Sequence, residues 1–267
     1  MKDKHKVAHF YNRVSKIYDA SYQNAYWRLY QKATWDNLRK HLPRDLSSQI
    51  LDIGGGTGLW AIKIAKTGYC VVLADISRGM LDTAQKKCEA ERLLQKISFV
   101  ECDICDMKAF GDASFDFVLS QGDPISCCGN PRKAIQEIHR VMKPQAKTIC
   151  SVDNKFGAMH YFLDQGKLDE LEHFLRTGWS HWLTEQQEEQ FDVKFFSPQE
   201  IQNLFIEAGF TVLSIMGKTM IPWRRYPKLL EDTNLFDQIC KIEFSLNQEA
   251  SLLGSASHIE IVAQKNG

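Results

Sequence analysis

A run of glycines between residues 51 and 58 has a spacing that suits a nucleotide-like ligand. The segment reads Leu-Asp-Ile-Gly-Gly-Gly-Thr-Gly, so that Gly54, Gly56 and Gly58 alternate along it. Glycines let the backbone turn tightly and approach a ligand closely, and a helix after them presents free N–H groups. In a dinucleotide-binding loop the third glycine comes three residues after the second, whereas here it comes two residues after it. Asp52 adds a carboxylate that would repel a pyrophosphate but suits the ammonium group of an amino acid.

Two further carboxylates follow predicted strands in the same part of the chain. Asp75 ends the segment Val-Leu-Ala-Asp, and Asp103 ends the segment Val-Glu-Cys-Asp. A carboxylate after the second strand of a nucleotide-binding fold can accept hydrogen bonds from a ribose. Asp103 lies where a carboxylate could accept from the amino group of adenine. A single aspartate at a strand end is usually a helix cap or a turn residue, but these three with a glycine loop predict a pocket for a cation, a ribose and an adenine.

The elements that must position these residues alternate between strand and helix. Short apolar runs predict strands, and the segments between them have helical periodicity or helix-capping residues. The predicted strands are residues 49–53, 70–74, 97–101, 115–120, 146–152, 210–215 and 258–263. Such alternation is typical of an α/β fold, in which helices cover both faces of a parallel sheet and ligands bind at the carboxyl ends of its strands.

The chain resembles the class I S-adenosylmethionine-dependent methyltransferases. The similarity lies in the first motif at residues 52–58, the second at Asp75, the adenine-binding motif at 101–104, the fourth strand at 115–120 and the turn at 137–144. Residues 10–19 are similar to the N-terminal lid of the subgroup that contains the ubiquinone/menaquinone methyltransferases. The resemblance implies a Rossmann-like, seven-stranded, mostly parallel sheet with an antiparallel last strand.

The resemblance also implies S-adenosylmethionine as the methyl donor and S-adenosylhomocysteine as the product. The residues that we assign to the donor on this basis are Tyr11, Tyr18, Asp52, Gly54, Gly56, Gly58, Asp75, Ile76, Met80, Asp103, Ile104, Ser120 and Gln121.

Four segments are expected along the chain. Residues 1–45 form an N-terminal helical lid, and residues 46–153 form the donor-binding core. Residues 154–196 interrupt the alternation and are predicted to be a helical insertion that caps the substrate. Residues 197–267 complete the core fold.

The acceptor site is less sharply predicted, because methyl transfer depends mainly on proximity and orientation and needs a base only for some acceptors. Asp123, His160 and Tyr161 are the candidate catalytic residues. A second group could line an acceptor pocket, namely Tyr22, Trp27, Tyr30, Asp153, Trp179, Trp182 and Trp223. Packing between the lid and the insertion is the alternative role for these aromatic residues.

Charge and composition narrow the class of acceptor. The 267 residues carry 33 basic and 33 acidic side chains, and this balance argues against a protein that holds nucleic acid through its phosphates. We therefore expect a small-molecule acceptor, with an RNA, a quinone-type lipid or a non-catalytic sensor role as alternatives. The cysteines are interpreted as structural thiols, so no metal is expected. A charged N-terminal segment and the lack of an apolar run of about 18 residues predict a cytoplasmic protein without a membrane span. The expected oligomeric state is a monomer or homodimer, and the sequence does not decide between them.

Overall fold

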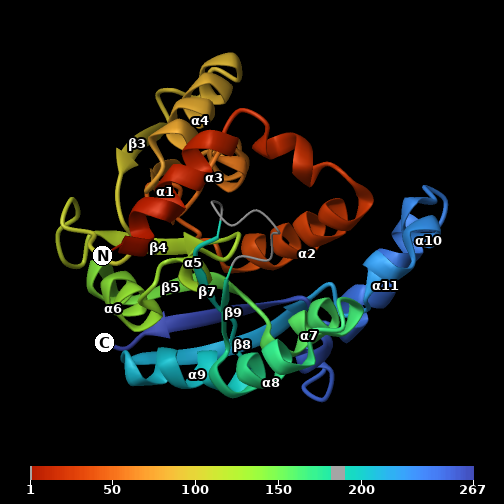
Figure 1. The fold of residues 1–267 in the computed structure, drawn as a ribbon. Helices are drawn as coiled ribbons and strands as arrows, with labels where there is room; N and C mark the ends of the chain where they lie inside the picture. Colours follow the sequence, from red (N-terminus) through yellow and green to blue (C-terminus); the bar gives the residue numbers. More distant parts are fainter. Residues whose placement is uncertain (1, 182–189) are drawn as a thin grey trace.

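A seven-stranded sheet forms the centre of the computed structural model, which describes residues 2–181 and 190–267. Its strands are β1 (Gln49–Ile53), β2 (Cys70–Asp75), β3 (Ile97–Glu101), β4 (Phe115–Ser120), β5 (Met142–Asp153), β8 (Phe210–Lys218) and β9 (His258–Lys265). The strand order is β3-β2-β1-β4-β5-β9-β8, and only β9 runs antiparallel to its two neighbours (Figure 1). The predicted Rossmann-like sheet with an antiparallel last strand is confirmed.

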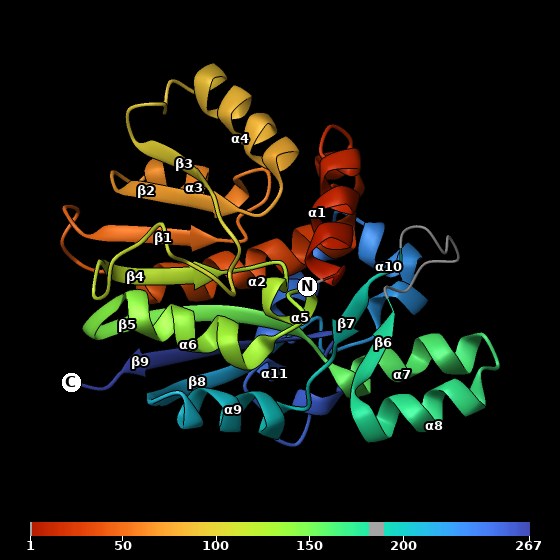
Figure 2. The same cartoon turned by 60° about the vertical axis from the view of Figure 1, so that its left-hand side comes forward.

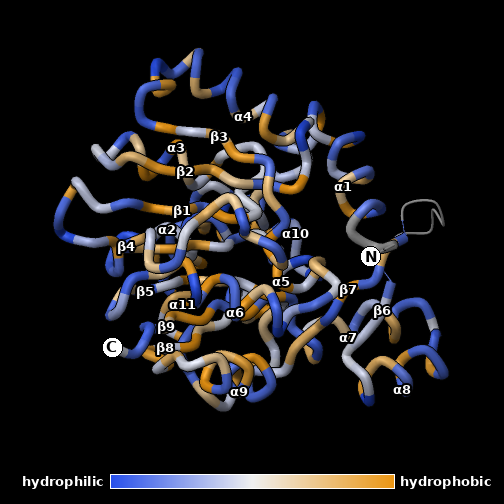
Figure 3. The backbone as a smooth tube through the Cα atoms, turned by 90° about the vertical axis from the view of Figure 1, so that its left-hand side faces the viewer, coloured by the Kyte–Doolittle hydropathy of each residue, from blue (hydrophilic) through white to orange (hydrophobic). Residues whose placement is uncertain are grey.

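Helices cover both faces of this sheet, and each face has its own hydrophobic core. On one face lie α2 (Ala25–His41), α3 (Leu59–Ala65) and α4 (Arg78–Ala90), and on the other lie α5 (Pro124–Cys127), α6 (Pro131–Val141) and α9 (Pro198–Glu207). Figure 2 shows the parallel strands ending at one common edge, and Figure 3 shows hydrophobic residues along the strands and hydrophilic residues on the outward turns of α4. The carboxyl ends of the parallel strands therefore lie side by side along one edge of the sheet.

The N-terminal segment lies across the end of this row. Helix α1 (Lys2–Val14) packs against α4, and a short 3-10 helix, η1 (Tyr18–Tyr22), leads from it to α2. Asn12 fastens α1 to the start of α4, because its Oδ1 accepts from the Ser77 hydroxyl at 2.8 Å and from the Gly79 N–H at 2.8 Å.

The segment after β5 contains more than helix. Helices α7 (Lys155–Asp164) and α8 (Leu168–Thr177) pack together, as the prediction of a helical insertion requires. However, β6 (Trp179–His181) and β7 (Asp192–Lys194) then form a separate two-stranded antiparallel sheet, which the sequence reading did not predict. Buried phenylalanines from both parts, including Phe162, Phe174 and Phe195, build a third core.

The segment between β8 and β9 is helical but divided into short pieces. It contains η3 (Trp223–Arg225), α10 (Pro227–Glu231), α11 (Phe236–Leu246) and η4 (Leu253–Ser255). Asp232 adopts an extended conformation and ends α10, and its carboxylate accepts from the Asn234 N–H at 2.8 Å. Among the described helices, none has the length and apolar character that crossing a membrane requires.

Candidate active site

A cavity of about 750 Å³ opens at the carboxyl edge of the parallel strands. This volume lies within the range of roughly 300–1,000 Å³ that small-molecule sites occupy. Its walls come from the ends of β1 to β5, from the N-terminal segment and from the start of β9. The position is the one that an α/β sheet offers to a ligand.

The glycine loop after β1 forms one wall of the cavity, and its geometry explains the glycines. Gly54 has φ +72°, and a Cβ there would lie 2.3 Å from Pro124 Cγ. A Cβ on Gly55 would lie 2.2 Å from Leu73 Cδ1. A Cβ on Gly56, which also has positive φ, would meet no protein atom within 4 Å, although Gly56 lines the cavity. The loop is therefore packed tightly from behind and leaves bare backbone toward the space where a ligand fits.

Asp52 does not line this cavity, which corrects its predicted contact with the donor. The loop folds over its side chain, and Asp52 Oδ2 accepts from the Ala61 N–H of α3 at 3.1 Å. Burial raises the pKa of Asp52 to about 7. This carboxyl group supports the loop from below instead of facing a ligand.

Asp75, at the end of β2, does line the cavity and organises the loop beside it. Its Oδ2 accepts from the Gly56 N–H at 2.8 Å, and its Oδ1 accepts from the Ser77 N–H at 2.8 Å. Burial raises the pKa of Asp75 to about 6. Ile76 and Met80 lie next to it along the wall. A carboxylate held by two backbone donors at this place fits the predicted ribose contact.

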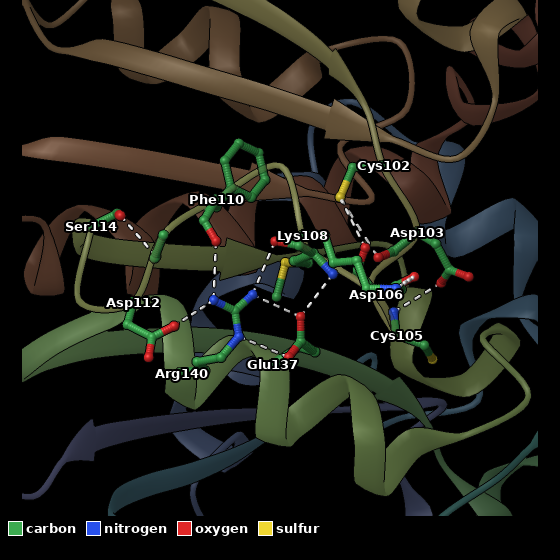
Figure 4. A network of polar contacts seen from close by, with 12 residues as sticks. Cys102, Asp103, Cys105, Asp106, Lys108, Phe110, Asp112, Ser114, Glu137 and Arg140 are labelled. Atoms are coloured by element: carbon green, nitrogen blue, oxygen red, sulfur yellow. Dashed lines mark hydrogen bonds and ion pairs between the residues drawn. The ribbon is translucent and has the colours of Figure 1, made fainter.

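The loop after β3 carries Asp103 and Ile104 into the cavity wall. It is held by α6, because Arg140 Nη2 donates to the Met107 carbonyl at 2.9 Å and Glu137 Oε2 accepts from the Met107 N–H at 2.7 Å. Figure 4 shows Arg140 also reaching the Phe110 carbonyl, at 3.0 Å, and Asp112. The position of Asp103 is thus fixed from outside the cavity.

The N-terminal segment closes the cavity with a row of aromatic rings. Tyr11, Tyr18, Tyr22 and Trp27 follow one another along the wall, with ring centroids 6.2, 4.5 and 4.5 Å apart. A half-exposed contact holds this segment to the glycine loop and α4, since Asp19 accepts from the Thr57 hydroxyl at 2.5 Å and from Lys87 Nζ at 2.7 Å.

Three titratable groups meet at the other end of the cavity. Asp123 follows β4, Asp153 ends β5 and His258 begins β9. His258 Nδ1 lies 2.9 Å from Asp123 Oδ2 and 3.7 Å from Asp153 Oδ1. This end of the cavity is called the acceptor end below, after the role that the sequence predicts for Asp123 and Asp153.

Burial and the neighbouring groups shift both carboxyl groups. Burial acts to raise the pKa of Asp123, but the nearby His258 and the Lys218 ammonium lower it below its usual value. Burial, followed by the Asp123 charge, raises the pKa of Asp153 to about 7. The two carboxyl groups therefore differ in proton affinity although they share one site.

Behind the acceptor end lies a fully buried ion pair. Lys218 Nζ is 3.1 Å from Glu260 Oε2, and it also donates to the Tyr30 hydroxyl at 2.9 Å and to Gln121 Oε1 at 2.9 Å. Tyr30 and Gln121 both line the cavity. The network therefore fixes two wall residues from α2 and from the loop after β4.

Sequence reasoning missed His258, although a signal was present. Because β9 runs antiparallel, its first residue lies at the edge where the parallel strands end. Asn154 fixes this start, since its Nδ2 donates to the carbonyls of Leu253 and Ala256, each at 2.8 Å. The antiparallel last strand predicted from residue 258 was that signal, because it places His258 at this edge.

Several predicted residues do not reach the cavity. Gly58 and Ser120 lie beside its walls without lining them. His160 is exposed on α7, where its Nδ1 lies 3.2 Å from Arg225, and Tyr161 packs into the core of the insertion. Their predicted catalytic role is corrected, because α7 places both outside the lining.

The tryptophans outside the N-terminal segment also differ from the prediction of an acceptor pocket. Trp223 is buried in a core with α2 and α11, and its indole donates to Glu243 at 2.8 Å. Trp179 lies on β6, outside the lining. Trp182 falls outside the described residues. The alternative of packing therefore applies to Trp223.

Comparison with known proteins places this site in a family. A family model described as a methyltransferase domain matches residues 50–145, which contain the glycine loop, Asp75 and Asp103. These residues form a methyltransferase domain, and the chain has the fold of S-adenosylmethionine-dependent methyltransferases. S-adenosylmethionine is the cofactor of this methyltransferase domain, and the bare glycine backbone and Asp75 fit it.

The chain has relatives whose names refer to different acceptors. It is 28% identical over 146 residues to the tRNA 5-carboxymethoxyuridine methyltransferase of Escherichia coli, covering 53% of this chain and 55% of that protein. It is 31% identical over 152 residues to the ubiquinone/menaquinone biosynthesis C-methyltransferase of Rickettsia prowazekii, covering 54% of this chain and 59% of the relative. The chain thus spans little more than half the length of these relatives.

Solved structures agree on the fold. An S-adenosylmethionine-dependent methyltransferase from Methanosarcina mazei superposes with a TM-score of 0.60 at 21% identity, covering 86% of this chain and 97% of the other. One from Mesorhizobium loti gives a TM-score of 0.58 at 17% identity, covering 87% and 98%. At these identities the similarity concerns the fold alone.

Proposed function

We propose that this methyltransferase moves a methyl group from S-adenosylmethionine to a small-molecule acceptor. The observation that carries the proposal is a single cavity whose two ends differ in chemistry. One end has the glycine loop and Asp75, the other has Asp123 and Asp153, and the aromatic rings of the N-terminal segment line the cavity between them. A donor and an acceptor bound together in one enclosed space would gain the proximity on which the reaction depends.

Each end of the cavity has a distinct role in this proposal. When bound, the donor supplies an electrophilic methyl carbon, whose bond to sulfur breaks as the acceptor's lone pair forms the new bond. The glycine loop, Asp75 and Asp103 hold and orient the donor. The aromatic rings over the cavity exclude water, and the acceptor end holds the nucleophile in line.

The neutral charge of the chain supports a small acceptor over RNA. A quinone-type lipid or a sensor without turnover would occupy the same cavity, so an experiment must separate binding from turnover.

Calorimetric titration with S-adenosylhomocysteine tests the donor site. Asp75→Asn removes the charge but keeps the shape of the side chain, and we expect at least tenfold weaker binding, since a hydrogen bond to a charged group contributes roughly 1.5–3 kcal/mol. Asp82→Asn is the matched control, because Asp82 lies on the exposed side of α4 and pairs with Arg78.

Two outcomes would count against the proposal. Absence of S-adenosylhomocysteine binding by the unaltered chain would refute the donor site itself. Binding without release of S-adenosylhomocysteine from S-adenosylmethionine, across a broad panel of small acceptors, would favour a sensor.

A further inference from the structure

The acceptor end contains two carboxyl groups in a space that is nearly closed to solvent. The side chain of Asp123 is 10% exposed and that of Asp153 is 18% exposed. Asp123 Oδ1 is buried and has no hydrogen-bond partner among residues 2–181 and 190–267. Burying a carboxylate without a partner costs free energy, so this oxygen indicates a group that the protein itself does not supply.

The cationic side chains around this end are engaged elsewhere or lie at its rim. Lys218 is fully buried behind the wall and binds Glu260, Gln121 and Tyr30. His258 lies against Asp123, with its Nδ1 2.9 Å from Asp123 Oδ2.

Two arginines line the cavity at its exposed side. Arg28 stacks over Phe236 at 5.5 Å, and Arg224 stacks over Tyr26 at 4.2 Å. Both arginines are exposed, and Arg224 also lies over the Trp27 ring, 5.5 Å from its centroid. The interior of the acceptor end therefore has negative character, while its mouth is positive.

Aromatic rings complete the surroundings of the two carboxyl groups. Tyr11, Tyr18, Tyr22 and Trp27 form the continuous row described above, and all of them line the same cavity. The face of an aromatic ring attracts an organic cation, and this attraction increases where water is excluded. Rings and carboxylates together recognise a positive charge on an apolar body.

We propose that the acceptor is a small amine that is positively charged in solution and is methylated on nitrogen. This inference rests on the proposed function and names its substrate class. The rings and Asp123 hold the cation at the acceptor end. Because a protonated amine has no free electron pair, its proton must leave before nitrogen can form the bond to carbon, and the proton passes to the Asp153 carboxylate.

A divalent metal ion is the competing occupant of the same place. One ligand atom from each of Asp123, Asp153 and His258 can be chosen so that all three lie within 4.8 Å of one another. His258 Nδ1 and Asp123 Oδ2 lie 2.9 Å apart, a separation that two ligands of one metal ion also have, so the neighbouring rings must distinguish the two occupants. The adjoining row of rings would add nothing to a metal site, whereas an organic cation uses both features.

Choline and 3,3-dimethylbutan-1-ol are matched probes, because they have the same shape and differ only in the positive charge. We would titrate each into the protein saturated with S-adenosylhomocysteine, with and without EDTA. We expect choline to bind at least tenfold more tightly than the neutral alcohol, and EDTA to change nothing.

Substitutions at the acceptor end show whether choline binds there. Asp123→Asn and Asp153→Asn should each weaken choline binding at least tenfold while leaving S-adenosylhomocysteine affinity within twofold. Asp169→Asn, on the exposed face of α8, is the control. Tyr22→Leu should weaken choline binding, whereas Tyr22→Phe, which keeps the ring, should retain it. This pair of variants still tests the inference if the two carboxyl variants fold poorly.

The outcomes separate the two proposals. Equal binding of choline and the alcohol would overturn the amine inference alone. Tight binding of Mn²⁺ or Zn²⁺ that Asp123→Asn abolishes, together with no preference for choline, would replace it with a metal site. Failure of S-adenosylhomocysteine to bind would overturn the proposed function and this inference with it.

Discussion

The buried pair of Lys218 and Glu260 allows a quantitative test of how the acceptor end is held. Both side chains are fully inaccessible to solvent, and Lys218 also donates to the Thr34 hydroxyl at 3.2 Å. Glu260 in turn accepts from Asn37 Nδ2 at 2.7 Å. Replacing Lys218 with methionine keeps most of the volume but leaves the Glu260 carboxylate buried without its cation.

We expect Lys218→Met to lower the free energy of unfolding by about 3–5 kcal/mol, the typical cost of breaking a buried ion pair. With roughly 2–4 °C of melting temperature per kcal/mol for a chain of this size, the melting temperature should fall by about 6–20 °C. Urea titration of the variant without ligand measures the first quantity, and calorimetric scanning measures the second.

A second substitution distinguishes an ion pair from simple packing. Glu260→Met in the Lys218→Met background removes the unpaired charge, so the double variant should recover about 1–3 kcal/mol relative to the sum of the single changes. Recovery is partial because Tyr30 and Asn37 lose hydrogen bonds in the double variant. Additive losses, or a loss below about 1 kcal/mol for Lys218→Met alone, would refute this account of the pair.

Two further predictions concern the donor side. Gly54→Ala should weaken S-adenosylhomocysteine binding at least tenfold, because its Cβ would lie 2.3 Å from Pro124 Cγ. Gly166 has a similar positive φ but no atom near its Cβ position, so Gly166→Ala should lower stability without changing that affinity. Equal effects of the two substitutions on the affinity would contradict the proposed clash at Gly54. Burial raises the pKa of Asp52 from 3.8 to about 7, so its stabilising contribution is complete below pH 3.8 and is lost as pH rises through about 7. Between pH 5 and pH 8 the melting temperature of the unliganded Asp52→Asn variant should therefore fall less steeply than that of the unaltered protein. The same slope in both proteins would show that Asp52 does not titrate in this way.

The donor side of the cavity could be predicted from sequence because each of its parts is a short segment next to a predicted strand. The glycine loop, the end of β2 and the end of β3 each follow a short apolar run, and parallel strands bring their ends to one edge. The prediction for Asp52 was wrong for an equally local reason. A side chain on β1 can point below the loop as well as above it, and only the packing of Gly55 over Asp52 decides between these directions.

The acceptor end could be predicted only in part, because it combines residues that are distant in the chain. Trp27, Asp123 and His258 come from α2, the loop after β4 and β9, and their meeting depends on the order of strands in the sheet. The aromatic content of the insertion suggested a binding surface, but Tyr161 and Trp179 lie outside the cavity lining. Periodicity cannot tell a ring that packs in a core from a ring that faces a ligand.

The position of β9 has a consequence for the order in which the molecule can assemble. Strand β8 joins the sheet only through β9, which comes after it in the chain and pairs with β5 more than a hundred residues earlier. Contacts between such distant segments slow folding, because a long loop must close before they form. Until β9 inserts, Lys218 has no Glu260 and the acceptor end has no His258. We therefore expect the donor half to acquire structure first during synthesis, with the acceptor half completed in a single late step.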